Sequence, residues 1–296
     1  MAGGYRTARR GAGTDLAGLR AYIEGDDARH IDWNVTARLN EPQLRVFNED
    51  RELTVWLVLD RSASMTVGTP GRGKHDVLSE LAVVLARLFS RSGNQVGALL
   101  YDNGAVRTVP PGTGRRHVLH LVAELNRPRP GGVPGGANGG RRGRRARANG
   151  GRQRGTTDLA AMLDAVARLA RRRSLIIVIS DFIGDGDWER SLLRLGPRHE
   201  VVALRVVDSA DDELPDAGLV VIEDAETGEQ LFVDSGDPLL RARLRTAVEE
   251  RDARLEAGMS RVGVPVHRID TTADLATALI EVVASTRLPN TGRRRL

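Results

Sequence analysis

The feature that most constrains the fold is a pair of nearly uninterrupted apolar runs, at residues 53–59 and 174–180. Such runs are typical of strands buried on both faces of a parallel sheet, because a strand with one solvated face alternates apolar and polar residues. Helical spacing of apolar residues follows the first run at 74–90 and precedes the second at 158–170. The sequence therefore predicts an α/β fold with a doubly wound, mostly parallel central sheet flanked by helices.

The same alternation continues through the rest of the chain. Further strands are predicted at 95–101, 105–109, 200–207 and 264–269, and further helices at 115–125, 188–195, 238–257 and 273–285. Two short apolar stretches, 219–223 and 230–233, flank a turn and predict a hairpin. Ligands of such open sheets bind at the carboxyl ends of strands, where the strand order reverses, so polar residues at those ends are the first candidates for a site.

Composition limits the class of protein. Of 296 residues, 41% are apolar and only 3% are aromatic, which predicts a globular core built mainly from aliphatic side chains. The absence of cysteine excludes disulfides and thiolate zinc sites. No apolar stretch approaches the roughly 20 residues that span a bilayer, and no apolar segment of a signal peptide follows the first arginines. We therefore expect a cytoplasmic protein without a transmembrane segment.

Charge is concentrated in one segment. Residues 127–154 carry nine arginines and no acidic residue, so removing them from the net charge of +5 leaves −4 for the remainder. We interpret 127–154 as a disordered Arg/Gly-rich insert. The predicted organisation is a mobile N-terminus (1–20), an irregular arm with one strand at 43–48 (21–52), an α/β domain interrupted by the insert (53–288) and a basic tail (289–296).

Oxygen-bearing side chains gather at the predicted carboxyl edge of the sheet. Asp60, Ser62 and Ser64 follow the first buried strand, Asp181 follows the second, and Thr156 and Thr157 precede the helix that leads into the second. Carboxylate and hydroxyl oxygens suit hard cations rather than zinc. The pattern predicts one divalent cation, Mg²⁺ in the first place, with Mn²⁺ or Ca²⁺ as alternatives. Asp102 and Thr156 are expected beside this site.

The Asp-x-Ser-x-Ser pattern, with the threonine and the second aspartate, resembles the metal-ion-dependent adhesion site of von Willebrand factor A domains. The resemblance implies that Ser62, Ser64 and Thr157 coordinate the metal, and that Asp60 and Asp181 do so directly or through water. Thr157 fits the family pattern better than Thr156. The implied role is binding of an aspartate or glutamate carboxylate from a protein partner to the metal.

A second resemblance lies upstream. Residues 25–38 read G-D-D-A-R-H-I-D-W-N-V-T-A-R, which is similar to the hallmark of the bacterial family called domain of unknown function 58. The signature positions are Gly25, Asp26, Asp27, Arg29, Asp32, Trp33 and Arg38. Many members carry two N-terminal transmembrane helices, which we do not expect in this chain. Members often accompany MoxR-type AAA+ ATPases, which implies an adaptor or chaperone-like role.

Two interpretations of the arm and three of the function stay open. The charges of the arm form either an active site or second docking surface, or a scaffold in which they pair with Arg38 and Arg45 while Trp33 packs on the domain, and we favour the scaffold. The leading function is non-enzymatic, metal-dependent protein binding. The alternatives are a metal-dependent hydrolase or phosphotransferase using Asp60 and Asp181, and a nucleic-acid-binding adaptor acting through the insert. The insert has no aromatic residue for base stacking, and no nucleophile motif occurs, so both are less favoured.

Overall fold

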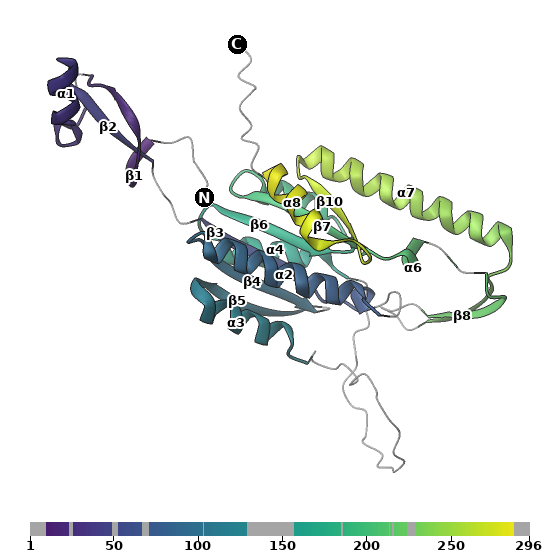
Figure 1. The fold of residues 1–296 in the computed structure, drawn as a ribbon. Helices are drawn as coiled ribbons and strands as arrows, with labels where there is room; N and C mark the ends of the chain where they lie inside the picture. Colours follow the sequence, from purple (N-terminus) through teal and green to yellow (C-terminus); the bar gives the residue numbers. More distant parts are fainter. Residues whose placement is uncertain are drawn as a thin grey trace. The chain divides into compact units, whose positions relative to one another are not determined.

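The structure is a computed structural model, and it describes residues 10–23, 26–48, 53–66, 71–102, 104–128, 157–184, 186–212, 214, 216–223 and 229–286. The chain divides into two compact units that meet between Leu53 and Thr54. Figure 1 labels their elements along the chain. Most of the arginine-rich insert, the basic tail, Gly25 and Thr156 lie outside the described residues.

The smaller unit is a hairpin with a short helix. Strands β1 (Arg10–Ala21) and β2 (Gln43–Asn48) pair antiparallel, and η1 (Ala28–His30) and α1 (Trp33–Leu39) lie between them in sequence. β2 has the predicted bounds. The prediction of a mobile segment up to residue 20 differs from the structure, because residues 10–20 belong to β1. Their glycine-rich sequence has little strand propensity, so the pairing with β2, distant in sequence, determines this strand.

Ion pairs and caps organise this unit. Asp32 caps α1 by accepting hydrogen bonds from two backbone amides at its start, and its Oδ2 lies 2.9 Å from Nε of Arg45, as the scaffold interpretation expects. Asp26 pairs with Arg20 through two hydrogen bonds of 2.6 Å rather than with Arg38, because β1 brings Arg20 beside it. These arginines lower the pKa of both carboxyls.

The remaining signature residues of the smaller unit have local roles. Asp27 caps η1 by accepting a hydrogen bond from the backbone amide of Arg29. Trp33, the first residue of α1, contributes no core to this unit, since its side chain is 68% exposed. The arm is thus not irregular throughout, and α1 was missed because seven residues are too few to show a helical period.

The larger unit is built on a six-stranded sheet in the order β10-β7-β6-β3-β4-β5, in which only β5 runs antiparallel to its neighbour. Its strands are β3 (Thr54–Asp60), β4 (Gln95–Asp102), β5 (Ala105–Gly112), β6 (Ser174–Ser180), β7 (Glu200–Val207) and β10 (Val266–Asp270). The mixed α/β class with a central, mostly parallel sheet is therefore confirmed. The edge strand β5 contains two prolines, which cannot donate hydrogen bonds to a further strand.

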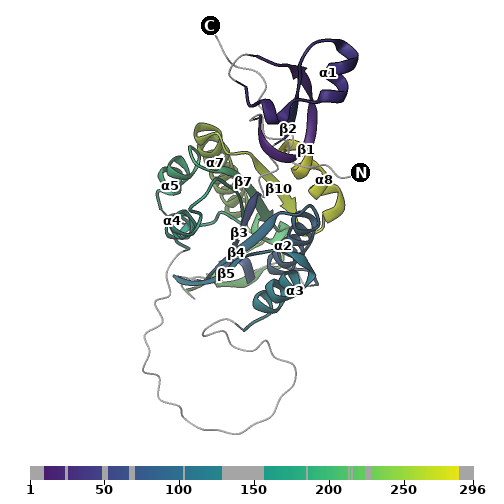
Figure 2. The same ribbon diagram turned by 90° about the vertical axis from the view of Figure 1, so that its left-hand side faces the viewer.

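Helices cover both faces of this sheet. They are α2 (Lys74–Arg91), α3 (Gly114–Leu125), α4 (Leu159–Leu169), α5 (Trp188–Leu195), α7 (Pro238–Val262) and α8 (Leu275–Thr286), with the short η2 (Ser64–Thr66) and α6 (Ser209–Asp212). Figure 2 shows α2, α3 and α8 on one face of the sheet and α4, α5 and α7 on the other. The four residues of α6 are too short for a periodic pattern, which explains why the sequence does not predict it.

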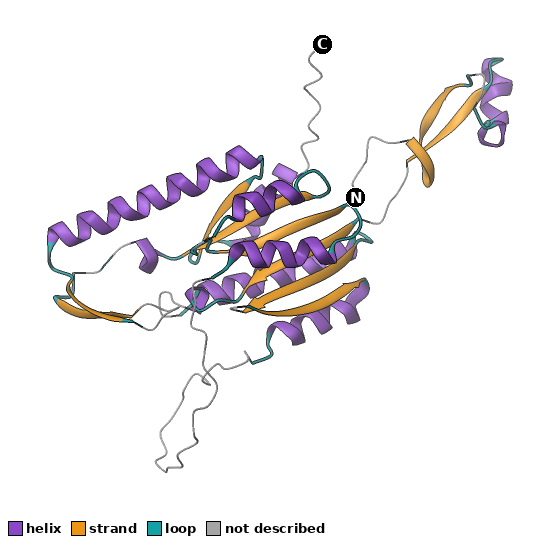
Figure 3. Cartoon of the chain, turned by 180° about the vertical axis from the view of Figure 1, so that it is seen from behind, coloured by secondary structure: helices purple, strands orange, loops and turns teal. Residues whose placement is uncertain are grey.

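The central strands are buried on both faces. In β3 every residue after Thr54 is buried, and in β6 all seven are. Side chains of alternate residues point to opposite faces, so Trp56 and Val58 pack toward α4, while Leu57 faces the opposite layer. The predicted hairpin forms a separate two-stranded sheet of β8 (Leu219–Glu223) and β9 (Gln230–Asp234), seen away from the main sheet in Figure 3.

The strand order reverses direction at the centre of the sheet. β3 has β4 on one side and β6 on the other. The connections after β3 and β6 therefore lead toward opposite sides, and ligands of open α/β sheets bind beyond the carboxyl ends of strands at such a point. The polar residues predicted as a site follow these two strands.

Candidate metal centre

The Asp60–Ser64 turn closes tightly on itself at the end of β3. The backbone amide of Ser62 donates to Oδ1 of Asp60 at 2.9 Å, and the hydroxyl oxygens of Ser62 and Ser64 lie 3.0 Å apart. The amide of Arg61 donates to the carbonyl of Tyr101 on β4 at 2.7 Å, which fixes the turn to the neighbouring strand. Asp60, Ser62 and Ser64 are all buried. The turn thus brings two hydroxyls and one carboxylate together, as the sequence predicts.

Asp60 has a second partner that the sequence does not predict. The hydroxyl of Ser180, the last residue of β6, donates to Oδ2 of Asp60 at 2.6 Å. The register pairs Leu59 with Ile179, so Ser180 lies opposite Asp60 across the two strands. The sequence shows that Ser180 directly precedes Asp181. Only the register between β3 and β6 shows that Ser180 lies opposite Asp60.

Asp181 is fixed by a strained turn after β6. Its Oδ1 accepts a hydrogen bond of 3.0 Å from the amide of Ile183. Phe182, between them, has φ of +55°, a left-handed conformation that costs a non-glycine residue roughly 1–3 kcal/mol. The buried ring of Phe182 and the 2.9 Å bond from its amide to the Ser180 hydroxyl hold that conformation. The backbone therefore directs Asp181 toward the same edge as Asp60.

Thr157 lies two residues before the start of α4. It is fully buried and directly precedes Asp158, whose side chain caps α4 by accepting from the amide of Ala161 at 2.8 Å. Gly184 lies against it so closely that a Cβ at that position would collide with the carbonyl oxygen of Thr157. The turn after Asp181 and the start of α4 are thus in direct backbone contact.

A lysine and a third carboxylate complete the edge. Nζ of Lys74, the first residue of α2, lies 3.0 Å from Oδ2 of Asp181 and 2.8 Å from Oδ2 of Asp211 on α6. Burial disfavours the charged amine, but Asp181 and Asp211 outweigh it and raise the pKa of Lys74. Neither Lys74 nor Asp211 was predicted as part of the site. The signal in the sequence is that Lys74 is the only lysine of the chain.

The electrostatics of Asp60 favour a cation nearby. Burial and, to a lesser extent, the negative charge of Asp181 together raise the pKa of Asp60 to about 6, although the hydrogen bonds from Ser180 and Ser62 oppose this. A positive charge between the two carboxylates would relieve both effects. Burial likewise raises the pKa of Asp211.

The donor set is consistent with a hard divalent cation. Within the described residues, no three His, Cys, Asp or Glu side chains form a group that would hold a metal by themselves. Hydroxyl oxygens would therefore have to complete the coordination, and Ser62 and Ser64 offer them beside Asp60. Mg²⁺ accepts one or two carboxylates with neutral oxygens and water. Asp102, half-buried, ends β4 one residue beyond Tyr101, the register partner of Asp60, and so lies on the neighbouring strand.

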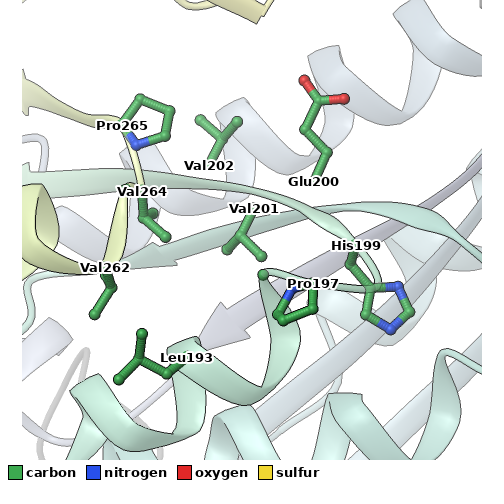
Figure 4. A pocket seen from close by; sticks show the side chains of 11 residues that line it. Leu193, Pro197, His199, Glu200, Val201, Val202, Val262, Val264 and Pro265 are labelled. Atoms are coloured by element: carbon green, nitrogen blue, oxygen red, sulfur yellow. The ribbon is translucent and has the colours of Figure 1, made fainter. Parts of the chain in front are cut away.

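A groove of about 430 Å³ lies elsewhere, at the amino ends of β7 and β10. Figure 4 shows Val201, Val262 and Val264 among its mostly apolar lining, with His199 at one side. It contains none of the predicted site residues. Because the parallel strands place their amino and carboxyl ends at opposite edges, this groove and the Asp60 cluster are separate features.

Relatives of this chain occur in mycobacteria. An uncharacterized protein of Mycobacterium bovis is 37% identical over 280 residues, which are 94% of this chain and 81% of that protein. An uncharacterized protein of Mycobacterium avium is 37% identical over 132 residues, which are 44% of this chain and 76% of that protein.

Two solved structures are similar at low identity. The conserved hypothetical protein BatB of Bacteroides thetaiotaomicron matches with a TM-score of 0.46 at 16% identity, over 79% of this chain and 98% of that chain. An aerotolerance-related membrane protein of Bacteroides fragilis matches with a TM-score of 0.46 at 14% identity over the same shares. In the part of this chain that the structure describes, no helix has the length and apolarity to cross a membrane. The model of the family described as protein of unknown function DUF58 matches residues 18–254, and the chain therefore belongs to that family.

Proposed function

We propose that the larger unit is a non-enzymatic, metal-dependent protein-binding domain of the von Willebrand factor A type. Its ligand is an aspartate or glutamate carboxylate of a protein partner, which completes the coordination of a divalent cation, Mg²⁺ in the first place. The observation that carries this proposal is the pair of hydroxyls of Ser62 and Ser64, 3.0 Å apart, beside the fully buried Asp60.

The strand order and the position of the site support the proposal. The cluster lies where the connections after β3 and β6 lead to opposite sides, which is where ligands bind in open α/β sheets. Ser62, Ser64 and Thr157 would hold the cation with Asp60 and Asp181. When bound, the cation supplies a positive charge that its protein ligands only partly compensate, and this charge attracts an external carboxylate.

The contacts of the two aspartates exclude Lys74 as the base or nucleophile of a hydrolase or phosphotransferase at this site. The groups bonded to Asp60 and Asp181 are a serine hydroxyl, backbone amides and the ammonium of Lys74. General base catalysis requires a group that is unprotonated and within hydrogen-bond reach of the attacking group. Lys74 is held protonated between two carboxylates, so it supplies neither a base nor a nucleophile at neutral pH.

We further propose that the partner is a MoxR-type AAA+ ATPase, which the family resemblance of residues 25–38 implies. Such an ATPase would present an acidic side chain to the metal, and the chain would act as its adaptor. The direct test is a pull-down between the purified chain and a MoxR-type ATPase of the same genome, with Mg²⁺ and with EDTA.

Three variants make this test specific. Ser64→Ala removes one hydroxyl and Asp60→Ala one carboxylate from the cluster, and both should abolish capture. Asp164→Ala, at a partly exposed ion pair with Arg194 on the surface of α4, is the matched control and should leave capture unchanged. Thermal unfolding in EDTA checks that each variant folds.

Each alternative has its own outcome. Mg²⁺-dependent phosphoester hydrolysis that Ser64→Ala abolishes would overturn the binding proposal in favour of an enzyme. Affinity for nucleic acid that is lost on deletion of residues 127–154 but is indifferent to EDTA would favour the adaptor that acts through the insert. Capture that persists in EDTA would show that the metal is not needed.

A further inference from the structure

The one lysine of this chain lies inside the candidate metal centre. The chain has 44 lysines and arginines together, and 43 of them are arginines. Lys74 is only 1% exposed, although lysine is almost never fully buried unless it is paired. The ammonium of lysine is a compact point charge that fits between two carboxylates, whereas the guanidinium of arginine is planar and larger. The position therefore depends on a point charge of this size.

The backbone does not favour a positive charge at this position. Lys74 is the first residue of α2, where the helix dipole disfavours cations. Among the described residues, two carboxylates offset this cost and that of burial, and they come from different elements: Asp181 follows β6 and Asp211 is on α6. The ammonium is thus a fixed charge shared between the site and α6.

Lys74 also occupies one of the oxygens that a metal would use. Oδ2 of Asp181 bonds to Nζ of Lys74 at 3.0 Å, and Oδ1 bonds to the amide of Ile183 at 3.0 Å. Both oxygens of Asp181 are therefore engaged. A carboxylate that already shares its charge with an ammonium attracts a second cation less strongly, and the ammonium repels that cation directly.

We propose that Lys74 lowers the affinity of this centre for its divalent cation, and that Asp211 moderates the effect by sharing the charge of Lys74. This inference rests on the proposed function of the site. Its consequence is that the cation alone is held weakly, and that the carboxylate of the partner supplies the negative charge which retains it. Metal binding and partner binding then reinforce one another.

The test is a calorimetric titration of metal-stripped protein with Mg²⁺ alone, at one pH and one ionic strength. Lys74→Met removes the ammonium and keeps an unbranched side chain, so the affinity for Mg²⁺ should rise about tenfold. Asp211→Asn removes one negative charge and leaves the charge of Lys74 directed at Asp181, so the affinity should fall about tenfold. A role in packing alone would not move the affinity in opposite directions.

The double variant Lys74→Met/Asp211→Asn controls for the effect of leaving one buried charge without its partner. It removes both the ammonium of Lys74 and the carboxylate of Asp211, so neither stays buried and unpaired. Its affinity should lie between those of the two single variants. Thermal unfolding in EDTA reports whether each protein is folded, and Ser64→Ala in each background shows that Mg²⁺ is bound at this centre.

The outcomes separate this inference from the function on which it rests. If the unsubstituted chain binds Mg²⁺ and both single variants weaken it, Lys74 is only a scaffold and the inference is overturned while the metal centre stands. If Lys74→Met alone binds Mg²⁺, the inference is supported in its strongest form. If no protein of the set binds Mg²⁺, the metal centre and the inference both fail.

Discussion

The hydroxyl of Ser180 donates to Oδ2 of Asp60 at 2.6 Å, and the two residues are 120 positions apart in sequence. This bond joins the carboxyl ends of the two central strands inside the buried edge of the sheet. The Ser180 hydroxyl also accepts from the amide of Phe182, so one oxygen connects Asp60 with the strained turn that carries Asp181.

Replacing this serine should affect both stability and metal binding. Ser180→Ala leaves Oδ2 of the buried Asp60 without its donor, which should lower the free energy of unfolding by about 1–3 kcal/mol. It should also weaken Mg²⁺ binding, because the pKa of Asp60 rises further. Ser174→Ala is the matched control at the other end of β6, where the hydroxyl donates to the carbonyl of Arg172. Urea unfolding measures the stability of both variants, and calorimetry measures their affinity for Mg²⁺. Equal losses in Ser180→Ala and Ser174→Ala would contradict the prediction.

The raised pKa of Asp60 gives stability a defined pH dependence. In metal-free protein the folded state retains the proton of Asp60 up to about pH 6, whereas the unfolded chain releases it near its ordinary value of 3.8. The folded state thus binds more protons between these values, and stability falls as pH rises through that window. The contribution is about 3 kcal/mol at most. Asp60→Asn should remove it, so the difference between the two proteins in urea unfolding from pH 4 to 7 is the measurement.

Close packing at Gly184 should be needed to place Thr157. Gly184→Ala introduces a Cβ against the carbonyl oxygen of Thr157, and the two turns must separate. We expect a loss of about 1–3 kcal/mol in unfolding free energy and a lower Mg²⁺ affinity. Gly196→Ala is the control, since its Cβ would meet only an ordinary contact of 3.6 Å with the carbonyl of Leu192. Equal Mg²⁺ affinity in all three proteins would exclude Thr157 from the site.

The smaller unit offers a test of the scaffold interpretation of its charges. Asp32→Ala removes both the cap of α1 and the ion pair with Arg45, whereas Asp32→Asn can still accept from the amides of Asn34 and Val35. Amide exchange at Asn34 and Val35 should accelerate strongly in Asp32→Ala and less in Asp32→Asn. Unchanged exchange in Asp32→Ala would speak against a structural role for this aspartate.

A buried histidine far from the metal centre predicts sensitivity to acid. Burial lowers the pKa of His199, and the neighbouring charge of Arg198 lowers it further. Because the unfolded chain then binds a proton more readily than the folded protein, this contribution to stability is present above about pH 6.5 and is lost as pH falls below it. His199→Gln should reduce the loss between pH 7 and 5 in urea unfolding. A larger loss in the variant would contradict the prediction.

Elements whose patterns are local were predictable from the sequence. β6 and β7 have the predicted bounds, and β3 differs by one residue at each end, because continuous apolar runs identify buried strands by themselves. The sequence does not predict β1, because this strand depends on its pairing with the distant β2. It does not predict α6, because four residues are too few to show a helical period.

The candidate site divides in the same way. Asp60, Ser62 and Ser64 belong to one short motif at a strand end, so their clustering was predictable. Ser180 acts through the register of β3 and β6, and Lys74 and Asp211 meet only after α2, α6 and the turn following β6 have packed. Such partners leave no periodic signal in the sequence.

The pairing of β3 with β6 has a consequence for the order of events during synthesis. Thr54 pairs with Ser174, so the ribosome must add more than a hundred residues after β3 before its central neighbour exists. Domains fold as units during translation, at roughly 5–20 residues per second. For several seconds Asp60 has therefore been synthesised while Ser180, its hydrogen-bond donor, has not. The cluster that holds Lys74 can therefore be complete only after the residues through Asp211 have been synthesised.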